Sequence, residues 1–338
     1  MDQRRRAALA SAGIALIFLL VQVGALALVE PFKAAGYQPV QNPDDPTNSL
    51  FYLVAILAMT GLLLAAIKLD LQRLLRAFIV FTGAYIALFV FGVVVPALGL
   101  PTVGGFHLLA WAGAAVLAVV LWVYPEWYVI DATGVVMGIG ATGMFGISFG
   151  IFPALVLLAV LAVYDAISVY GTEHMLTLAS GVMEMRVPVV LVVPLTLSYS
   201  FIDGELPNPA ADGGEPSDDG ESTPDEAVGA SDPEEHDRDA LFIGLGDAVI
   251  PSVLVASAGY FLTDAPALDL LGLSVPVPAL TAMVGTFLGL AVLLRMVLAG
   301  RAHAGLPLLN GGAIAGYLVG ALASGLTLVE ALGVEHFL

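Results

Sequence analysis

The sequence has no cysteine and very few charged residues. Without cysteine the chain forms no disulfides, binds no metal through thiolates and has no cysteine nucleophile. Charged residues make up 12% of the 338 positions, whereas soluble globular domains carry roughly 25%. Apolar residues make up 59% and fall in long unbroken runs, and a run of about 18 or more is typical of a helix that crosses a membrane. We therefore expect an integral membrane protein.

The apolar runs predict an all-α, polytopic membrane fold with nine transmembrane helices, six before a long polar loop and three after it. The spans are expected at 7–29, 50–67, 77–98, 104–124, 127–147, 150–170, 241–262, 276–299 and 307–327. Pro125-Glu126 separates the fourth span from the fifth, and glycines with Pro153 separate the fifth from the sixth. The first span has a second interpretation as a signal peptide, because Ala25-Leu26-Ala27 resembles a cleavage site. Its apolar run of about 23 residues is longer than the core of a signal peptide, which favours a retained helix.

The basic residues are distributed unequally between the two sides of the predicted membrane. Nine spans place ten of the eleven Lys and Arg residues on the same side as the N-terminus, and the exception is Lys33. Cytoplasmic loops are enriched in Lys and Arg. We therefore expect a multi-pass protein of the cell membrane with its N-terminus in the cytoplasm and its C-terminus outside.

The net charge of −18 comes mostly from one segment, since residues 203–239 hold 14 of the 29 acidic residues and a single arginine. The segment is rich in Pro, Gly and Ser, so it cannot bury enough apolar surface to fold and is expected to be a disordered cytoplasmic loop. It divides the chain into an N-terminal six-helix membrane part, 1–202, and a C-terminal three-helix membrane part, 240–338. Just before it, the β-branched VPVVLVVPL at 187–195 is too short to span and predicts an extended segment at the membrane face.

Two carboxylates lie within predicted spans at matching places. Asp165 is near the end of the sixth span and Asp247 is near the start of the seventh, so each is expected roughly 8–9 Å inside the cytoplasmic end of its helix at 1.5 Å per residue. An ionised Asp at the bilayer centre costs about 2.5–3.5 kcal/mol on insertion scales. Neither acid has a Lys or Arg inside the membrane to pair with, so the two acids are expected to pair with each other and to share one proton. Asp131 is interpreted as a structural or interfacial residue.

Such a pair can hydrolyse a peptide bond, because the carboxylate deprotonates a water while the acid protonates the leaving nitrogen. Gly244 and Gly246 precede Asp247 and carry no side chains. Small residues let neighbouring helices approach closely, which short side chains such as Asp require. We interpret these glycines as spacers on the helix of Asp247.

Three short motifs in order give the chain a resemblance to a known family. Tyr164-Asp165 lies in the sixth span, Gly244-Leu245-Gly246-Asp247 in the seventh, and Pro307-Leu308-Leu309 at the start of the ninth. This order and the nine-span layout resemble the presenilin and signal peptide peptidase family of intramembrane aspartyl proteases. The family has Ala where this chain has Leu308, which changes the packing beside the acids.

The resemblance implies a role for each motif. Asp165 and Asp247 would be the catalytic pair, and Tyr164 would pack beside the first acid. Gly244 to Gly246 and Pro307 to Leu309 would shape the active site and the docking of substrate. The substrates would be transmembrane-helix proteins in the lipid bilayer that unwind before cleavage, and the segment 187–195 would offer them a strand edge.

Other classes of function have less support in the sequence. The five histidines, at 107, 174, 236, 303 and 336, are scattered and form no metal site, and no cofactor or nucleic acid is expected. A proton-coupled transporter using the same acids remains an alternative, although no internal repeat is visible. A proteolytically silent scaffold and a prepilin-type peptidase, which also uses a GxGD acid, are further alternatives. The sequence carries no signal for an oligomeric state.

Overall fold

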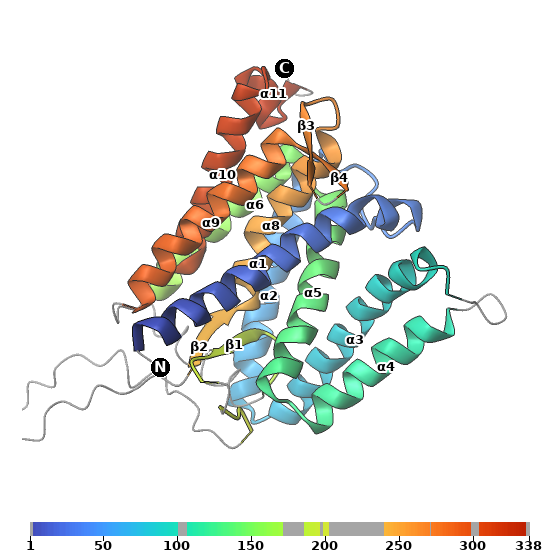
Figure 1. The fold of residues 1–338 in the computed structure, drawn as a ribbon, viewed down its shortest axis with the longest axis vertical. Helices are drawn as coiled ribbons and strands as arrows, with labels where there is room; N and C mark the ends of the chain where they lie inside the picture. The colour runs from blue at the N-terminus through green and yellow to red at the C-terminus, as the bar shows by residue number, and fades with distance from the viewer. Residues whose placement is uncertain are drawn as a thin grey trace, which may run out of the picture.

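The computed structural model describes residues 3–100, 107–171, 186–196, 199–202, 240–270, 272–298 and 304–335. In these ranges every predicted span contains one long helix, which confirms the all-α polytopic fold (Figure 1). The long helices are α1 (Gln3–Ala34), α2 (Thr47–Lys68), α3 (Gln72–Ala97), α4 (Leu108–Val123), α5 (Trp127–Ser148), α6 (Ile151–Gly171), α8 (Leu245–Phe261), α9 (Val277–Leu298) and α10 (Gly305–Ala323). A short helix, α11 (Leu328–Leu332), follows. The predicted acidic loop and four of the five histidines lie outside the described residues.

Seven of these helices are long and apolar enough to cross a membrane, and α4 and α8 are shorter apolar helices of 16 and 17 residues. Helix α8 is short because the predicted span 241–262 does not begin as a helix. Residues 240–244 form strand β2 (Ala240–Gly244), and the helix starts only at Leu245. The prediction was wrong there because Ala-Leu-Phe-Ile is equally apolar in either conformation, and only pairing with another strand distinguishes the two.

The partner of β2 is strand β1 (Val190–Pro194), which lies inside the segment 187–195 that was predicted to be extended. The two strands are antiparallel, with Leu191 opposite Ile243 and Val193 opposite Leu241. The first turn of α8 begins at Leu245, directly after β2 ends. This small sheet lies at the end of the bundle where α1 begins and α4 connects to α5, and α11 lies at the opposite end with the hairpin β3–β4 (Ala267–Leu270 and Leu273–Pro276) (Figure 1).

Helix α8 lies inside the bundle and is packed by α1, α5, α6, α9 and α10. Its middle turns, from Val253 to Ala256, are completely buried. Helices α2, α3 and α4 instead expose large apolar side chains along their length. An exposed apolar surface of this kind suits contact with lipid tails. The fold therefore holds α8, which carries Asp247, in a rigid interior position.

Helices α9 and α10 pack backbone against backbone (Figure 1). A Cβ atom built on Gly285 would lie 2.0 Å from the carbonyl oxygen of Gly312, and one built on Gly312 would lie 2.2 Å from that of Gly285. A Cβ on Gly289 would lie 2.3 Å from the carbonyl oxygen of Leu308. Only residues without side chains allow two membrane helices to approach this closely. The contact fixes where the first turn of α10 lies.

Gly285→Ala should destabilise the fold by about 1–3 kcal/mol, because the added methyl group meets a backbone carbonyl that cannot rotate away. The matched control is Gly61→Ala on α2, where a Cβ meets no described atom within 4 Å. Thermal unfolding of both purified variants in detergent measures the difference. Equal stability of the two variants would contradict the tight contact between α9 and α10.

Candidate active site

Asp165 lies on α6, six residues before the helix ends at Gly171, as the sequence predicted. Its side chain is 8% exposed. Asp247 lies in the first turn of α8 and is partly exposed. The expected depth of Asp247 within a helix was therefore wrong, since the residues before it form β2. The structure nevertheless brings the two acids together, and their carboxylates interact electrostatically.

Both carboxylates meet the first turn of α10. The backbone N–H of Leu306 donates a hydrogen bond of 3.0 Å to Oδ2 of Asp165, and the N–H of Gly305 donates to the same carboxylate. On its other side Gly305 faces Asp247, since a Cβ built on Gly305 would lie 3.0 Å from Oδ1 of Asp247. The N-terminus of a helix carries unpaired N–H groups and a partial positive charge, so it stabilises a carboxylate. Gly305 is thus the residue that lets one backbone segment contact both acids.

Among the described residues, each of the two carboxylates interacts with backbone N–H groups and with the other carboxylate. Asp247 accepts a hydrogen bond from the N–H of Gly244, which is the N-cap residue of α8. This is the backbone half of a capping box, in which an acid at the third helical position binds the N-cap amide. The bond fixes the side chain of Asp247 relative to the end of β2.

The glycines of the Gly-Leu-Gly-Asp motif do not act as helix spacers. Gly244 is in strand β2 with an extended backbone, and a Cβ there would meet only the carboxylate of Asp247 among described atoms within 4 Å. Gly246 is exposed, and no described atom lies within 4 Å of a Cβ built on it. The interpretation from sequence was wrong because Gly244 is not helical, and because Gly246, although it lies in the first turn of α8, has no neighbouring segment packed against it. The close approach beside the acids is made by Gly305 instead.

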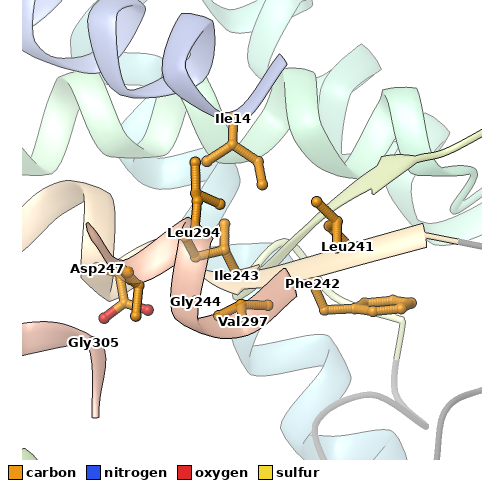
Figure 2. A pocket seen from close by; sticks show the side chains of 10 residues that line it. Ile14, Leu241, Phe242, Ile243, Gly244, Asp247, Leu294, Val297 and Gly305 are labelled. Carbon is orange, nitrogen blue, oxygen red and sulfur yellow. The ribbon is translucent and has the colours of Figure 1, made fainter. Parts of the chain in front are cut away.

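A cavity of about 130 Å³ lies along β2 and ends at Asp247 (Figure 2). Figure 2 shows the carboxylate of Asp247 beside Gly305 at one end of the cavity and the β2 residues Leu241 to Gly244 leading away from it. Its remaining lining residues are apolar and come from α1 and α9: Ile14, Leu293, Leu294 and Val297. The cavity therefore has β2 along its length, the carboxylate of Asp247 at one end and mostly apolar side chains around it.

The edge of β2 that faces away from β1 carries unused backbone groups. The N–H of Leu245 donates to the carbonyl of Val189 at 2.8 Å, so antiparallel alternation turns Leu241, Ile243 and Leu245 toward β1. Phe242 then directs its N–H and C=O outward, and it lines the cavity. In the described part of the chain these two groups of Phe242 have no hydrogen-bond partner.

Each of the remaining motif residues lies on a helix that carries an acid or contacts one. Tyr164 precedes Asp165 on α6 and is partly buried. Pro307 is in the first turn of α10, where the missing N–H of proline is tolerated. Leu309 is fully buried and Leu308 partly buried, and both pack in the core cluster that contains Leu245. The chain therefore accommodates Leu308, where the family has Ala, at the border of this core cluster.

Several site residues were not found from sequence. Gly305 and Leu306 act through backbone N–H groups, which every residue has, so no side-chain pattern marks them. The one sequence signal that could have indicated Gly305 was its position as a glycine two residues before the Pro307 motif. No three His, Cys, Asp or Glu side chains gather in the described part of the chain.

The chain was compared with known proteins. The family model described as signal-peptide peptidase, presenilin aspartyl protease matches residues 15–326. Two solved structures of a presenilin family intramembrane aspartate protease, in space groups C222 and P2, are 35% and 36% identical to the chain. They cover 93% and 92% of this chain and 99% and 97% of their own, with TM-scores of 0.62 and 0.60. No protein with a curated description matches. From its helices, its paired acids and these similarities, the chain belongs to the family of presenilin and signal-peptide peptidase aspartyl proteases.

Proposed function

We propose that Asp165 and Asp247 are the catalytic pair of this intramembrane aspartyl protease. The observation that carries the proposal is their joint contact with the first turn of α10, beside a cavity that follows a strand. Asp165 binds the backbone N–H groups of that turn, and Asp247 lies against Gly305. Among the described residues, no other two acids on different apolar helices contact the same backbone turn.

The pair hydrolyses the peptide bond through a water molecule. Adjacent carboxyl groups share one proton, since two like charges held together do not both ionise. The charged carboxylate removes a proton from the water as the water oxygen bonds to the scissile carbonyl carbon. The protonated carboxyl then gives its proton to the amide nitrogen while the carbon–nitrogen bond breaks. The products are a new carboxyl end and a new amine, and no covalent bond to the enzyme forms.

The substrate is a transmembrane helix that unwinds and pairs with the outer edge of β2. A helix hides its carbonyl groups in its own hydrogen bonds, so the scissile bond becomes accessible only after unwinding. The N–H and C=O of Phe242 replace the backbone partners that the unwound segment loses. β1 was expected to offer this edge, but β1 lies between β2 and α5, and the strand that borders the cavity is β2.

The other functions that the sequence left open have less support than the protease. The transporter hypothesis is not supported, because the matching family and the similar structures are proteases. The prepilin-type peptidases are a different class from the family whose model matches. A silent scaffold differs from a protease only in activity, so the cleavage assay below distinguishes them.

The expected division of the chain places one acid in each membrane part. Residues 1–202 contain Asp165, residues 240–338 contain Asp247, and the acidic loop expected at 203–239 lies outside the described residues. The parts join through three helices of the first part: α1 and α5 pack on α8, and α6 packs on α8 and α10. Asp165 reaches across the same boundary to the first turn of α10.

Asp165→Asn and Asp247→Asn should each lower cleavage by about 10²–10⁴-fold or more, because each removes one half of the proton exchange. The measurement is hydrolysis of a labelled transmembrane peptide by protein in detergent, with products identified by mass spectrometry. Asp264→Asn is the matched control, because Asp264 is exposed just beyond the opposite end of α8. Retained cleavage by either folded variant would disprove the catalytic pair.

Gly305→Ala should lower kcat about tenfold or more while the protein stays folded. The new methyl group would lie 3.0 Å from Oδ1 of Asp247 and would displace the carboxylate, and small misplacements of reacting groups are costly. Gly311→Ala on the same helix is the control, since its Cβ meets no described atom within 4 Å. Equal rates for the two variants would show that the first turn of α10 does not position Asp247.

The N-terminus and the acidic loop should lie in the cytoplasm and the C-terminus outside the cell membrane. The end of the bundle that holds β1–β2 is also where α2 ends, at Lys68, and where α3 begins, with Arg73 and Arg76 in its first two turns. Cytoplasmic ends of membrane helices are enriched in such basic residues. Tags on both ends, probed with protease in intact cells, measure the orientation.

In this orientation we expect the enzyme to prefer single-span substrates with the N-terminus outside, since a fixed strand edge accepts one chain direction. A cytoplasmic C-terminus, or preference for the reverse substrate direction, would contradict the proposal.

A further inference from the structure

Two buried acids on α5 are not part of the catalytic pair. Glu126 is the N-cap residue of α5 and is 6% exposed, and Asp131 is one turn further along and is 9% exposed. A buried carboxylate without hydrogen bonds is costly. Both acids bind the same stretch of chain, the segment that contains β1 and the residues that follow it.

Asp131 binds the middle of β1. Its Oδ1 accepts a hydrogen bond of 2.8 Å from the backbone N–H of Val192, the central residue of the strand. This N–H is on the edge of β1 that faces away from β2, since Val189 and Leu191 are the residues turned toward β2. Pro194 has no N–H to offer on the same edge. The central donor of the outer edge of β1 is thus occupied by α5.

Two further contacts hold β1 and the chain after it on α5. Gly134, one turn after Asp131, faces Leu191, because a Cβ built on Gly134 would lie 2.7 Å from Cδ2 of Leu191. Glu126 accepts hydrogen bonds from the hydroxyl of Ser200 at 2.6 Å and from the N–H of Phe201 at 2.9 Å. Burial by itself raises the pKa of Glu126, but these bonds together with other backbone N–H groups outweigh it and lower that pKa, so Glu126 binds as a carboxylate.

These contacts matter because the sheet is very small. An isolated pair of strands is marginally stable, and a strand that slips by one residue turns all its side chains to the other face. β2 pairs only with β1 among described strands, and Asp247 comes three residues after β2 ends. The position of β2 relative to Asp247 therefore depends on where α5 holds β1.

We propose that Asp131 is a positioning residue of the protease, which anchors Val192 and thereby sets the register in which a substrate strand pairs with β2. The inference rests on the proposed function, because it assumes that substrate binds the outer edge of β2. Asp131 does not contact the reacting atoms. It acts through β1 and β2, and by occupying the donor of Val192 it also leaves β2 as the available edge. Its loss changes which peptide bond reaches the catalytic pair.

The test compares Asp131→Asn with Asp131→Ala in the full-length protein, using the labelled transmembrane peptide. Asn keeps an oxygen that accepts from Val192, so it should keep the wild-type cleavage position and rate. Ala removes the acceptor, so cleavage should spread to bonds one or more residues away, and kcat/KM for the main bond should fall about tenfold. Tyr317→Phe is the control, since it removes one buried side chain–backbone hydrogen bond, to the carbonyl of Ala331, far from the sheet.

A second variant reaches β1 without removing a hydrogen bond. Gly134→Ala places a methyl group against the flexible end of Leu191, so the protein should fold even where Asp131→Ala does not, and the cleavage position should shift as for Asp131→Ala. A wild-type product pattern in folded Asp131→Ala overturns the inference, as does a wild-type pattern in Gly134→Ala if Asp131→Ala fails to fold. A shift of the same size in Tyr317→Phe also overturns it. Absence of cleavage by the wild-type protein is a separate result, which rejects the proposed function itself.

Discussion

The first turn of α10 is the constraint on which the active site depends. Its backbone N–H groups bind Asp165, and Gly305 lies against Asp247, so one short segment sets the positions of both acids. The close contact between α9 and α10, at Gly285 and Gly312, determines where this first turn of α10 lies. A site assembled from backbone groups is rigid, because main-chain donors on a packed helix have no rotamers to change.

In the proposed mechanism, the small β1–β2 sheet connects this rigid centre to the substrate. Its two edges are different, since the outer edge of β1 is bound by Asp131 on α5 and the outer edge of β2 borders the cavity. Strand pairing uses only backbone groups, so it can accept many sequences provided that they unwind. Apolar side chains from α1 and α9 complete the lining of the cavity beside this edge of β2.

Prediction from the sequence succeeded where the signal is local and failed where it depends on a distant partner. Long apolar runs locate the nine helices, because a membrane-spanning segment must satisfy its own backbone groups. The start of the seventh span was wrong, because 240–244 become a strand only through pairing with 190–194. The spacer role given to Gly244 was wrong for the same reason, and Gly246, although helical, is exposed and packs against no described segment. Asp165 and Asp247 were brought together as expected, and their catalytic role remains a proposal.

The sequence by itself determined that the chain crosses a membrane repeatedly, which spans carry acids, and which family its motifs resemble, since apolar length and residue order are one-dimensional properties. Only the tertiary structure decided that Gly305 and Leu306 contact the acids, that β2 offers the open edge, and that Asp131 holds β1. These features consist of backbone groups and close approaches between segments far apart in the chain. Every residue carries the same N–H and C=O, so only their arrangement in space gives them a role.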